Sequence, residues 1–373
     1  MPHAWLDPDE IARLDTPLVV VDLDRMDANI ERMAALMRDR GVALRPHAKT
    51  HKSLRVARRQ VAAGAVGLTV ATIGEAEVFA AGGIEDLFIA YPVLAVGPKA
   101  ERLRRLADSC HLSVGTDSIE GVMALASAFH DAGTGTAPAV LIEIDSGGRR
   151  SGVLPVAAGG LAARAIDAGL RVVGVFTHAG QAYGGPDRRP GAADEEVEGL
   201  AAAAESMRDS GIEPTVISAG STPTAPLSAR PPVTEERPGT YVFGDRQQLV
   251  LAGDPADEAG TAALAVAATV VSHGARGGFL VDAGAKVLGK DTAPYAPGHG
   301  LVLGYPDAVL SRVNDHHGVA EVPDGTPRPQ IGEVVWIVPN HACPVVNLVD
   351  ELVIVQGGRI VDRWPVDARG RNS

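Results

Sequence analysis

The sequence is poor in cysteine, and it has no long apolar run. Its 373 residues include only two cysteines, Cys110 and Cys343, too few for a disulfide framework and typical of a reducing compartment. No stretch supplies the roughly 18 consecutive apolar residues of a membrane span. Charges interrupt the N-terminal segment MPHAWLDPDEIARLD, where a signal peptide needs an apolar core. We therefore expect a cytoplasmic protein that is neither inserted in a membrane nor secreted.

Positive charge is also scarce. The chain has 34 Lys and Arg against 46 Asp and Glu, a net charge of −12. Binding to nucleic acid or to anionic lipid requires an excess of Lys and Arg. The charge balance therefore argues against a nucleic acid or a membrane surface as the partner.

What the sequence does contain is a repeated alternation of short apolar runs and Ala-rich segments of helical period, from residue 42 onward. Eight strands are predicted, over residues 43–49, 67–72, 86–93, 111–117, 139–147, 171–180, 214–220 and 240–245. Helices are predicted between them, over residues 53–64, 74–83, 98–109, 118–133 and 195–211. This pattern predicts an α/β fold, a (β/α)8 barrel over residues 24–254.

The last third of the chain has a different pattern. Val-rich runs separated by Gly turns occupy residues 263–273, 277–284, 317–322, 332–340 and 351–366, which predicts a C-terminal antiparallel β domain over residues 255–373. The early apolar run at 16–24 either pairs with this domain or adds a strand to the barrel. Our domain assignment places strand 16–23 in the β domain. A chain longer than the roughly 250 to 300 residues of a single core fits a barrel plus a smaller module.

Lys49 lies in the basic stretch RPHAKTHK, at the end of the first predicted barrel strand. The chemistry of such barrels is located at the C-terminal ends of the strands. The neighbouring His47, His51 and Lys52 favour an unprotonated amine, which is the form that attacks an aldehyde. The alternative is a solvent-facing basic turn.

Other predicted strand ends are polar as well. EIDSGGRRSGV (143–153) places Arg149 and Arg150 after a glycine turn, where a permanent charge can bind an anion or a ring nitrogen. The loops SAGSTPT (218–224) and ERPGTYVFGD (236–245) have the composition of a phosphate site, because barrels often bind phosphate after strands 7 and 8. A surface arginine and ordinary turns are the alternatives.

The segment PNHACPVVNL (339–348) separates His341 and Cys343 by one residue. If the segment is extended, both side chains project from the same face and can share a metal ion, for which zinc is favoured. With two protein ligands such a site stays open to substrate oxygens. The alternative is that both are buried packing residues.

Taken in order, the stretches RPHAKTHK, DSGGRRSG, THAGQAY, GSTPT, PGTYVFGD and PNHACPVVNL resemble one family over nearly the whole chain. This is the D-serine dehydratase and D-threonine aldolase family, fold type III pyridoxal 5′-phosphate (PLP) enzymes related to alanine racemase. The resemblance implies a barrel followed by a β domain, a small D-amino acid as substrate, and a homodimer.

The resemblance also implies roles for individual residues. Lys49 is the lysine that binds PLP covalently, and Arg150 faces the pyridine nitrogen. His341 and Cys343 hold a divalent metal, zinc or alternatively manganese. Tyr183 takes part in catalysis or contacts the cofactor, unless it only packs a loop. Thr222, Gly239 and Thr240 hold the cofactor phosphate, and Gly220 and Ser221 also bind the cofactor.

The implied activity is that of a lyase on D-β-hydroxy-α-amino acids. Lys49 removes the α-proton and the metal helps the β-hydroxyl to leave, which gives a keto acid and ammonia. We expect a D-serine-type dehydratase, because Tyr183, Cys343 and the G-S-T-P turn match the dehydratases. The aldolases tend to carry a histidine and an aspartate at the first two positions.

Three alternatives remain for the function. One is a D-threonine aldolase, which gives glycine and an aldehyde. Another is an amino-acid racemase, with Tyr295 or Tyr305 as the second base. The third is a PLP-binding protein without turnover. Phe176 departs from the dehydratases, which place a tyrosine there.

Overall fold

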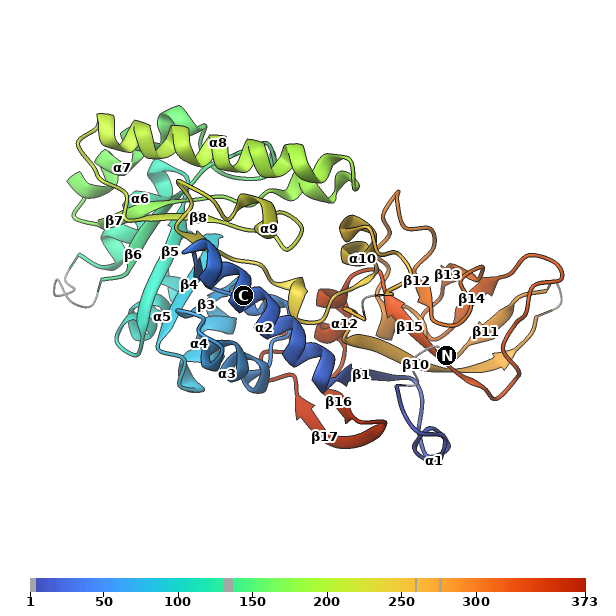
Figure 1. Cartoon of the computed structure of the whole chain (residues 1–373). Coiled ribbons are helices and arrows are strands. Elements are labelled where there is room, and N and C mark those ends of the chain that lie inside the picture. Colours follow the sequence, from blue (N-terminus) through green and yellow to red (C-terminus); the bar gives the residue numbers. More distant parts are fainter. Residues whose placement is uncertain (1–4, 131–136, 259, 275–276) are drawn as a thin grey trace. The chain divides into compact units, whose positions relative to one another are not determined.

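The computed structural model describes residues 5–130, 137–258, 260–274 and 277–373. Residues 131–133 of the predicted helix 118–133 lie outside this range, as do residues 259 and 275–276 of the predicted β domain. The chain divides into two compact units (Figure 1). The barrel unit comprises Arg32–Lys49, Val56–Gly239 and Gly370–Ser373. The β unit comprises the residues up to Glu31, Thr50–Arg55 and Thr240–Arg369.

Parallel strands form the centre of the barrel unit. Its described residues contain an eight-stranded sheet in the order β2-β9-β8-β7-β6-β5-β4-β3. A parallel bridge between His47 and Thr69 joins the two ends of this order and closes the ring. The predicted (β/α)8 barrel is therefore confirmed. The strands are β2 (Ala43–Leu44), β3 (Leu68–Val70), β4 (Asp86–Pro92), β5 (His111–Thr116), β6 (Ala139–Glu143), β7 (Arg171–Phe176), β8 (Val216–Ala219) and β9 (Glu235–Glu236).

The last of the predicted barrel strands was placed wrongly. Residues 240–242 form a 3-10 helix, η4 (Thr240–Val242), and the eighth strand is β9. Two adjacent glutamates look like a polar loop in the sequence, yet both are buried. Glu235 accepts a hydrogen bond from Arg45 Nε at 2.7 Å, and Glu236 accepts one from Ser228 Oγ at 2.6 Å. Buried carboxyl groups are tolerated when they have such partners.

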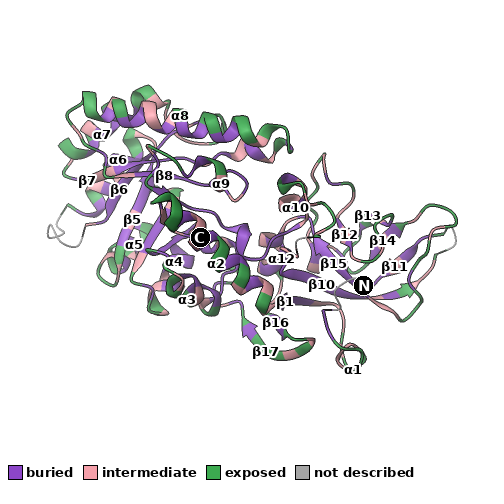
Figure 2. Ribbon diagram, in the orientation of Figure 1, coloured by how far each residue is buried: buried purple, intermediate pink, exposed green. Residues whose placement is uncertain are grey.

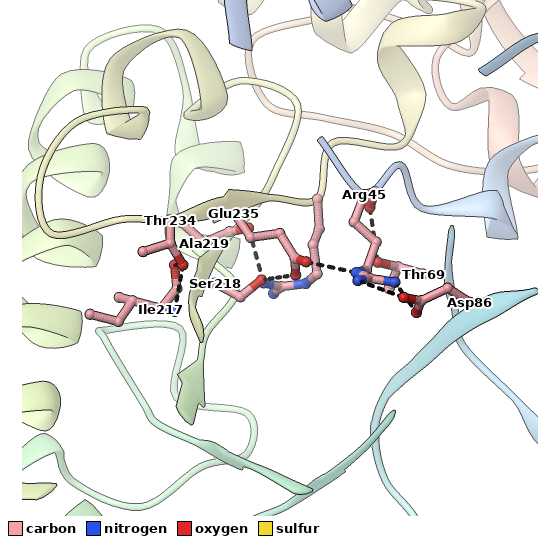
Figure 3. A network of polar contacts seen from close by, with 9 residues as sticks. Arg45, Thr69, Asp86, Ile217, Ser218, Ala219, Thr234 and Glu235 are labelled. Atoms are coloured by element: carbon pink, nitrogen blue, oxygen red, sulfur yellow. Dashed lines mark hydrogen bonds and ion pairs between the residues drawn. The ribbon is translucent and has the colours of Figure 1, made fainter. Parts of the chain in front are cut away.

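Part of the barrel interior is charged. The guanidinium of Arg45 donates to Glu235 and to Asp86, the latter at 2.5 Å, as Figure 3 shows. Ser218 Oγ donates to the other oxygen of Glu235 at 2.6 Å, and Thr69 Oγ1 donates to the carbonyl of Arg45 at 2.9 Å. Removing one member of such a buried ion pair costs about 3–5 kcal/mol. These contacts fix the short strands β2 and β9, which have few ladder hydrogen bonds of their own.

Helices alternate with the barrel strands and are buried on one side only, as the mixed colours of α8 in Figure 2 illustrate. In α5 the buried residues recur every third position, at Ala100, Leu103 and Leu106. The helix α7 was not predicted, because Gly159 and Gly160 lower its helix propensity. A Cβ on Gly159 would lie 2.0 Å from the Ser206 carbonyl oxygen. The helices are α3 (Leu54–Ala62), α4 (Ile73–Ala81), α5 (Pro98–Ala107), α6 (Ile119–Ala128), α7 (Ala158–Asp167), α8 (Arg188–Asp209) and α9 (Ala225–Ser228).

The β unit is built on a mainly antiparallel sheet. Its described residues form nine strands in the order β11-β14-β13-β12-β15-β10-β1-β16-β17, and β11 also pairs with β10. The early apolar run forms β1, which pairs antiparallel with β10 and parallel with β16. The strands are β1 (Leu18–Asp22), β10 (Leu264–Ser272), β11 (Phe279–Val281), β12 (Gly300–Val302), β13 (Val309–Val313), β14 (Gly318–Glu321), β15 (Val334–Pro339), β16 (Glu351–Gln356) and β17 (Arg359–Pro365).

Aromatic residues anchor one core of the β unit. Trp5 stacks on Trp336 with ring centroids 5.7 Å apart, and the guanidinium of Arg25 lies 5.3 Å from the Trp5 ring. The remaining helices are α1 (Pro8–Ile11), α2 (Leu23–Arg40), α10 (Arg246–Ala252), α11 (Ala285–Leu288) and α12 (Ala342–Leu348). Over the described ranges, no helix combines the length and the apolar character needed to cross a membrane.

Candidate active site

Lys49 lies where the sequence predicted it, just beyond the first barrel strand. It belongs to the 3-10 turn η1 (Ala48–Thr50), two residues after the bridge that His47 makes with Thr69. Its backbone N–H donates to His47 Nδ1 at 3.4 Å, and the residue is half-buried. The turn therefore presents a lysine at the C-terminal end of the barrel strands, where barrel enzymes carry their chemistry.

His178 is a site residue that the sequence reasoning did not single out. It follows β7, and its Nδ1 donates to the Gly220 carbonyl at 2.6 Å, which leaves Nε2 as the acceptor nitrogen. Burial, and then the charges of Lys49 and Arg150, lower the pKa of His178 to about 3. The ring is therefore neutral and close to two of the predicted site residues. Its place in the strand-end stretch THAGQAY was the available signal.

Arg150 is presented by a tight turn after β6. Asp145 Oδ1 accepts hydrogen bonds from the N–H groups of Gly147 and Arg149, at 2.9 and 3.0 Å, which shapes this turn. The Arg150 side chain is 65% exposed, and its Nη2 lies 3.9 Å from Glu143 Oε1. Burial raises the pKa of Glu143, the last residue of β6. The arginine thus keeps an accessible guanidinium at a strand end, as a role in ligand binding requires.

The two small-residue loops come together in the barrel unit. The Gly239 N–H donates to Thr222 Oγ1 at 3.2 Å. Within the first loop, Ser221 Oγ and Thr224 Oγ1 are hydrogen-bonded at 2.8 Å. A Cβ at Gly220 would lie 2.8 Å from Arg237 Cβ, so this position requires glycine. Backbone N–H groups and hydroxyls gathered after strands 7 and 8 are the groups that hold a phosphate in barrel enzymes.

Tyr183 and Phe176 lie on either side of His178 in the sequence. Tyr183 belongs to the 3-10 helix η3 (Gly180–Gly184), with its ring centroid 6.4 Å from that of His178. Phe176 ends β7 and packs edge-on against Phe88 at 5.0 Å. The guanidinium of Arg237 lies 5.3 Å from the Phe176 ring. Arg237 is another residue that the sequence alone did not indicate. Phe176 is thus part of the barrel core, and its ring offers no hydroxyl to a ligand.

His341 and Cys343 lie at the start of a helix in the β unit. His341 is the N-cap of α12 with extended backbone, whereas Cys343 is in the first helical turn. The prediction that both side chains project from one face depended on an extended segment. That segment ends at His341, so the prediction of an extended backbone is wrong beyond this residue. The two side chains are still close enough for a hydrogen bond, and this hydrogen bond to Cys343 contributes to the raised pKa of His341. His341 Nδ1 donates to Asp291 Oδ2 at 2.6 Å, which directs Nε2 away from Asp291.

The surroundings of this pair favour a cation. Burial lowers the pKa of His341, but the negative charges of Cys343, Asp291 and Asp245 outweigh it and raise the pKa to about 11. Imidazole nitrogen and thiolate sulfur are the donors that zinc prefers, so the residues present fit a metal ion. In the described ranges no group of three or more His, Cys, Asp or Glu side chains could hold a metal. A metal on this pair would therefore keep positions open.

Neighbouring groups hold the pair in place. Asp245 Oδ2 accepts from the Ala342 N–H at 3.0 Å, while its Oδ1 caps α10 by accepting from the Gln248 N–H at 2.9 Å. Cys343 Sγ is hydrogen-bonded to Thr50 Oγ1 at 3.2 Å, and Thr240 Oγ1 lies 3.9 Å from the same sulfur. Thr240, expected at the cofactor phosphate, is thus seen beside the sulfur in the β unit. Thr50 directly follows the candidate lysine in the chain.

Comparison with known proteins identifies relatives along the whole chain. Family models match for the alanine racemase N-terminal domain over residues 21–247 and for a serine dehydratase domain over residues 263–355. The chain is 40% identical to D-threo-3-hydroxyaspartate dehydratase of Delftia sp. (strain HT23), over 90% of this chain and 92% of the relative. It is 36% identical to D-threonine aldolase of Arthrobacter sp, over 97% and 94% of the two chains. The solved structure of the Delftia dehydratase superposes with a TM-score of 0.84 at 37% identity, covering 95% of this chain and 98% of that one.

The protein thus has the fold of the alanine racemase group and is an enzyme of the PLP-dependent lyase class. The chain belongs to the family of D-threo-3-hydroxyaspartate dehydratase and D-threonine aldolase, fold type III PLP enzymes. The family resemblance seen in the sequence is confirmed, and PLP is the cofactor expected of this family. Solved structures of that dehydratase include a cysteine-to-alanine mutant in the metal-free form and a histidine-to-alanine mutant. The two mutated positions are separated by one residue.

Proposed function

We propose that the protein is a PLP- and divalent-metal-dependent dehydratase that converts a D-β-hydroxy-α-amino acid to a keto acid and ammonia. The observation that carries the proposal is the contact between Cys343 and Thr50, the residue after Lys49. Within the β unit it places the sulfur of the metal pair beside the residue that directly follows the lysine in the chain. The mutated histidine and cysteine of the related dehydratase have the spacing of His341 and Cys343, which supports the assignment of the pair.

In this proposal the barrel unit binds PLP. Lys49 Nζ would hold the cofactor covalently, and the same amine would take the proton from the substrate α-carbon. Thr222, Ser221 and Gly239 hold the phosphate through their N–H and hydroxyl groups. PLP, when bound, supplies an electron sink for the negative charge that develops at the α-carbon. Arg150 would donate a hydrogen bond to the ring nitrogen without transferring a proton to it.

The β unit would hold the metal. His341 Nε2 and Cys343 Sγ are the two protein ligands, and Asp291 keeps the imidazole in the tautomer and orientation that ligation needs. The metal would supply Lewis acidity for the departure of the β-oxygen. Zinc fits a mixed nitrogen and sulfur donor set best, and manganese is the alternative. We further propose that the native protein is a homodimer, which light scattering of the purified protein tests.

Two substrates fit the dehydratase branch, D-serine and D-threo-3-hydroxyaspartate. The sequence has both Tyr183 and Cys343, a combination that is typical of the dehydratases by family resemblance, and this supports the dehydratase branch. The second candidate is a retro-aldol cleavage to glycine and an aldehyde. It is favoured by the likeness to D-threonine aldolase over 97% of this chain.

The test is to incubate the holoenzyme with D-serine, D-threo-3-hydroxyaspartate and D-threonine, with and without a chelator. We expect keto acid and ammonia as products, and we expect the chelator to abolish their formation. The L-enantiomers serve as the matched control. Glycine with an aldehyde would assign the protein to the aldolase branch. Inversion of the substrate without dependence on metal would overturn the proposal, and so would the absence of any product.

A further inference from the structure

Two buried glutamates outside the proposed reaction flank the loop Gly220–Thr224. Glu196 lies on α8 and Glu236 on β9, and both are 0% exposed. Glu236 pairs in register with Ala219, the residue before the loop. Glu196 Oε1 accepts a hydrogen bond from the Gly220 N–H at 3.0 Å. One carboxyl group therefore binds the first residue of the loop, and the other lies beside the strand that leads into it.

The far end of the loop is tied to the same two carboxyl groups. The Thr224 side chain is hydrogen-bonded to Glu196. Ser228 Oγ lies 2.6 Å from Glu236 Oε1 and 3.0 Å from the Thr224 carbonyl oxygen. A hydroxyl has one hydrogen, so it cannot donate to both oxygens. Ser228 donates to the nearer oxygen, Glu236 Oε1, so a proton on Glu236 belongs on Oε2, which has no hydrogen-bond partner.

The remaining oxygens of the pair also point to a shared proton. Glu196 Oε2 and Glu236 Oε2 are both buried and have no hydrogen-bond partner. Two ionised carboxylates, each with one buried oxygen that accepts no hydrogen bond, would be costly at such a site. A single proton held by the pair removes one of the two charges and supplies one donor.

We propose that Glu196 and Glu236 hold one proton between them and position the loop that binds the cofactor phosphate. In this arrangement Glu236 is a neutral acid, and Glu196 is the carboxylate that accepts from Gly220 and Thr224. The phosphate part of the inference rests on the proposed function, whereas the shared proton does not.

The charged neighbours agree with this assignment. Burial raises the pKa of Glu236 well above its ordinary value, and the charges of Glu196 and Glu235 raise it further. Burial also raises the pKa of Glu196. Arg237 faces both groups and acts in the opposite direction, but it does not outweigh burial.

The shared proton predicts how the stability of the cofactor-free protein depends on pH. The folded protein keeps a proton that the unfolded chain loses above pH 4.5, the ordinary pKa of a glutamate. The stabilisation is complete below that pH and is lost as the pH rises towards the folded pKa. Over this interval the unfolding equilibrium constant should rise by up to about tenfold per pH unit.

Thermal unfolding of the cofactor-free protein between pH 5 and pH 9 measures this effect. Glu236→Gln cannot ionise and still donates, so its profile should be flatter than that of the wild type. Glu198→Gln, an exposed glutamate on the same helix, should keep the wild-type profile. Parallel profiles for the wild type and Glu236→Gln would overturn the shared proton.

The positioning role is tested by comparing the affinities of PLP and of pyridoxal, which lacks the phosphate. Glu196→Ala removes the acceptor of the Gly220 N–H and should weaken PLP binding about tenfold, while pyridoxal binding stays nearly unchanged. Glu236→Gln should retain PLP affinity at pH 7. An equal loss for both ligands in Glu196→Ala would overturn the positioning role.

Two other outcomes of the affinity comparison lead to different conclusions. If Glu196→Ala does not fold, Glu236→Ala takes its place in the same affinity comparison, with the same outcomes. If the wild type binds neither ligand, the proposed function and the phosphate role both fail. The pH profile of the cofactor-free protein still decides the shared proton in that case.

Discussion

Two histidines near the candidate chemistry have pKa values shifted in opposite directions. In the barrel unit, burial and then the charge of Lys49 lower the pKa of His178 to about 3. In the β unit, burial also lowers the pKa of His341, but Cys343 and Asp291 more than compensate and raise it to about 11. Because burial acts on both rings in the same direction, the sign of the neighbouring charges explains the difference.

This difference shows what each unit is suited to bind. The barrel unit brings cationic side chains together with loops rich in N–H and hydroxyl donors, which suits an anion such as a phosphate or a carboxylate. The β unit surrounds its histidine with negative groups, which suits a cation. That cation is a proton in the metal-free protein and a metal ion in the proposed enzyme.

The largest expected effect follows from removing the cation beside His178. Lys49→Ala should lose the covalently held cofactor and reduce kcat by about 10³-fold or more, because both attachment and proton transfer depend on this amine. Borohydride reduction of the holoprotein followed by peptide mass spectrometry measures the attachment. Lys99→Ala, a substitution on the exposed side of α5, is the control. Cofactor still attached in Lys49→Ala would show that another lysine carries it.

The next effect concerns the anions around His341. Cys343→Ala should abolish tight zinc binding, and Asp291→Asn should weaken it about 10- to 100-fold, because the imidazole loses its orienting partner. Competition of the cofactor-free protein with a chromogenic zinc chelator measures both. Cys110→Ala, which replaces the only other cysteine, should bind zinc like the wild type. Unchanged zinc affinity in Cys343→Ala would remove the proposed metal site.

The smallest effect is the pH dependence due to His178. Its folded pKa of about 3 lies below the ordinary value of 6.5, so only the unfolded chain takes up a proton as the pH falls below 6.5. The folded state should lose up to about 1.4 kcal/mol of stability per pH unit from this group on acidification. His178→Gln, which can still donate to the Gly220 carbonyl, should be less acid-sensitive in denaturant unfolding between pH 7 and 4. The exposed His130→Gln should behave like the wild type, and equal sensitivity of all three would disprove the assignment.

Several elements of the fold were readable from local sequence because their physical cause is local. The runs over 86–93 and 111–117 became β4 and β5, because short runs with apolar residues between turn signals are typical of barrel strands. The strand β9 was missed for the opposite reason. Its glutamates are stable in the interior because Arg45, 190 residues from Glu235, and Ser228, eight residues from Glu236, supply hydrogen bonds. No pattern within a few residues encodes such a partner.

The candidate site shows the same division. Lys49, His341 and Cys343 could be proposed from the sequence because their motifs are short and contiguous. His178 and Arg237 were missed, since their roles depend on neighbours from other strands. His178 is defined by its hydrogen bond to Gly220, and Arg237 by its donation to Ser218 Oγ at 2.6 Å.

The sequence by itself determined the barrel and β-domain architecture, the family, and the lysine and metal-pair motifs, because hydrophobic period and contiguous motifs are properties of neighbouring residues. Only the tertiary structure decided which buried polar groups are charged. Protonation depends on the partners and the solvent exclusion that folding brings to each group, as the pair Glu196 and Glu236 and the two histidines show.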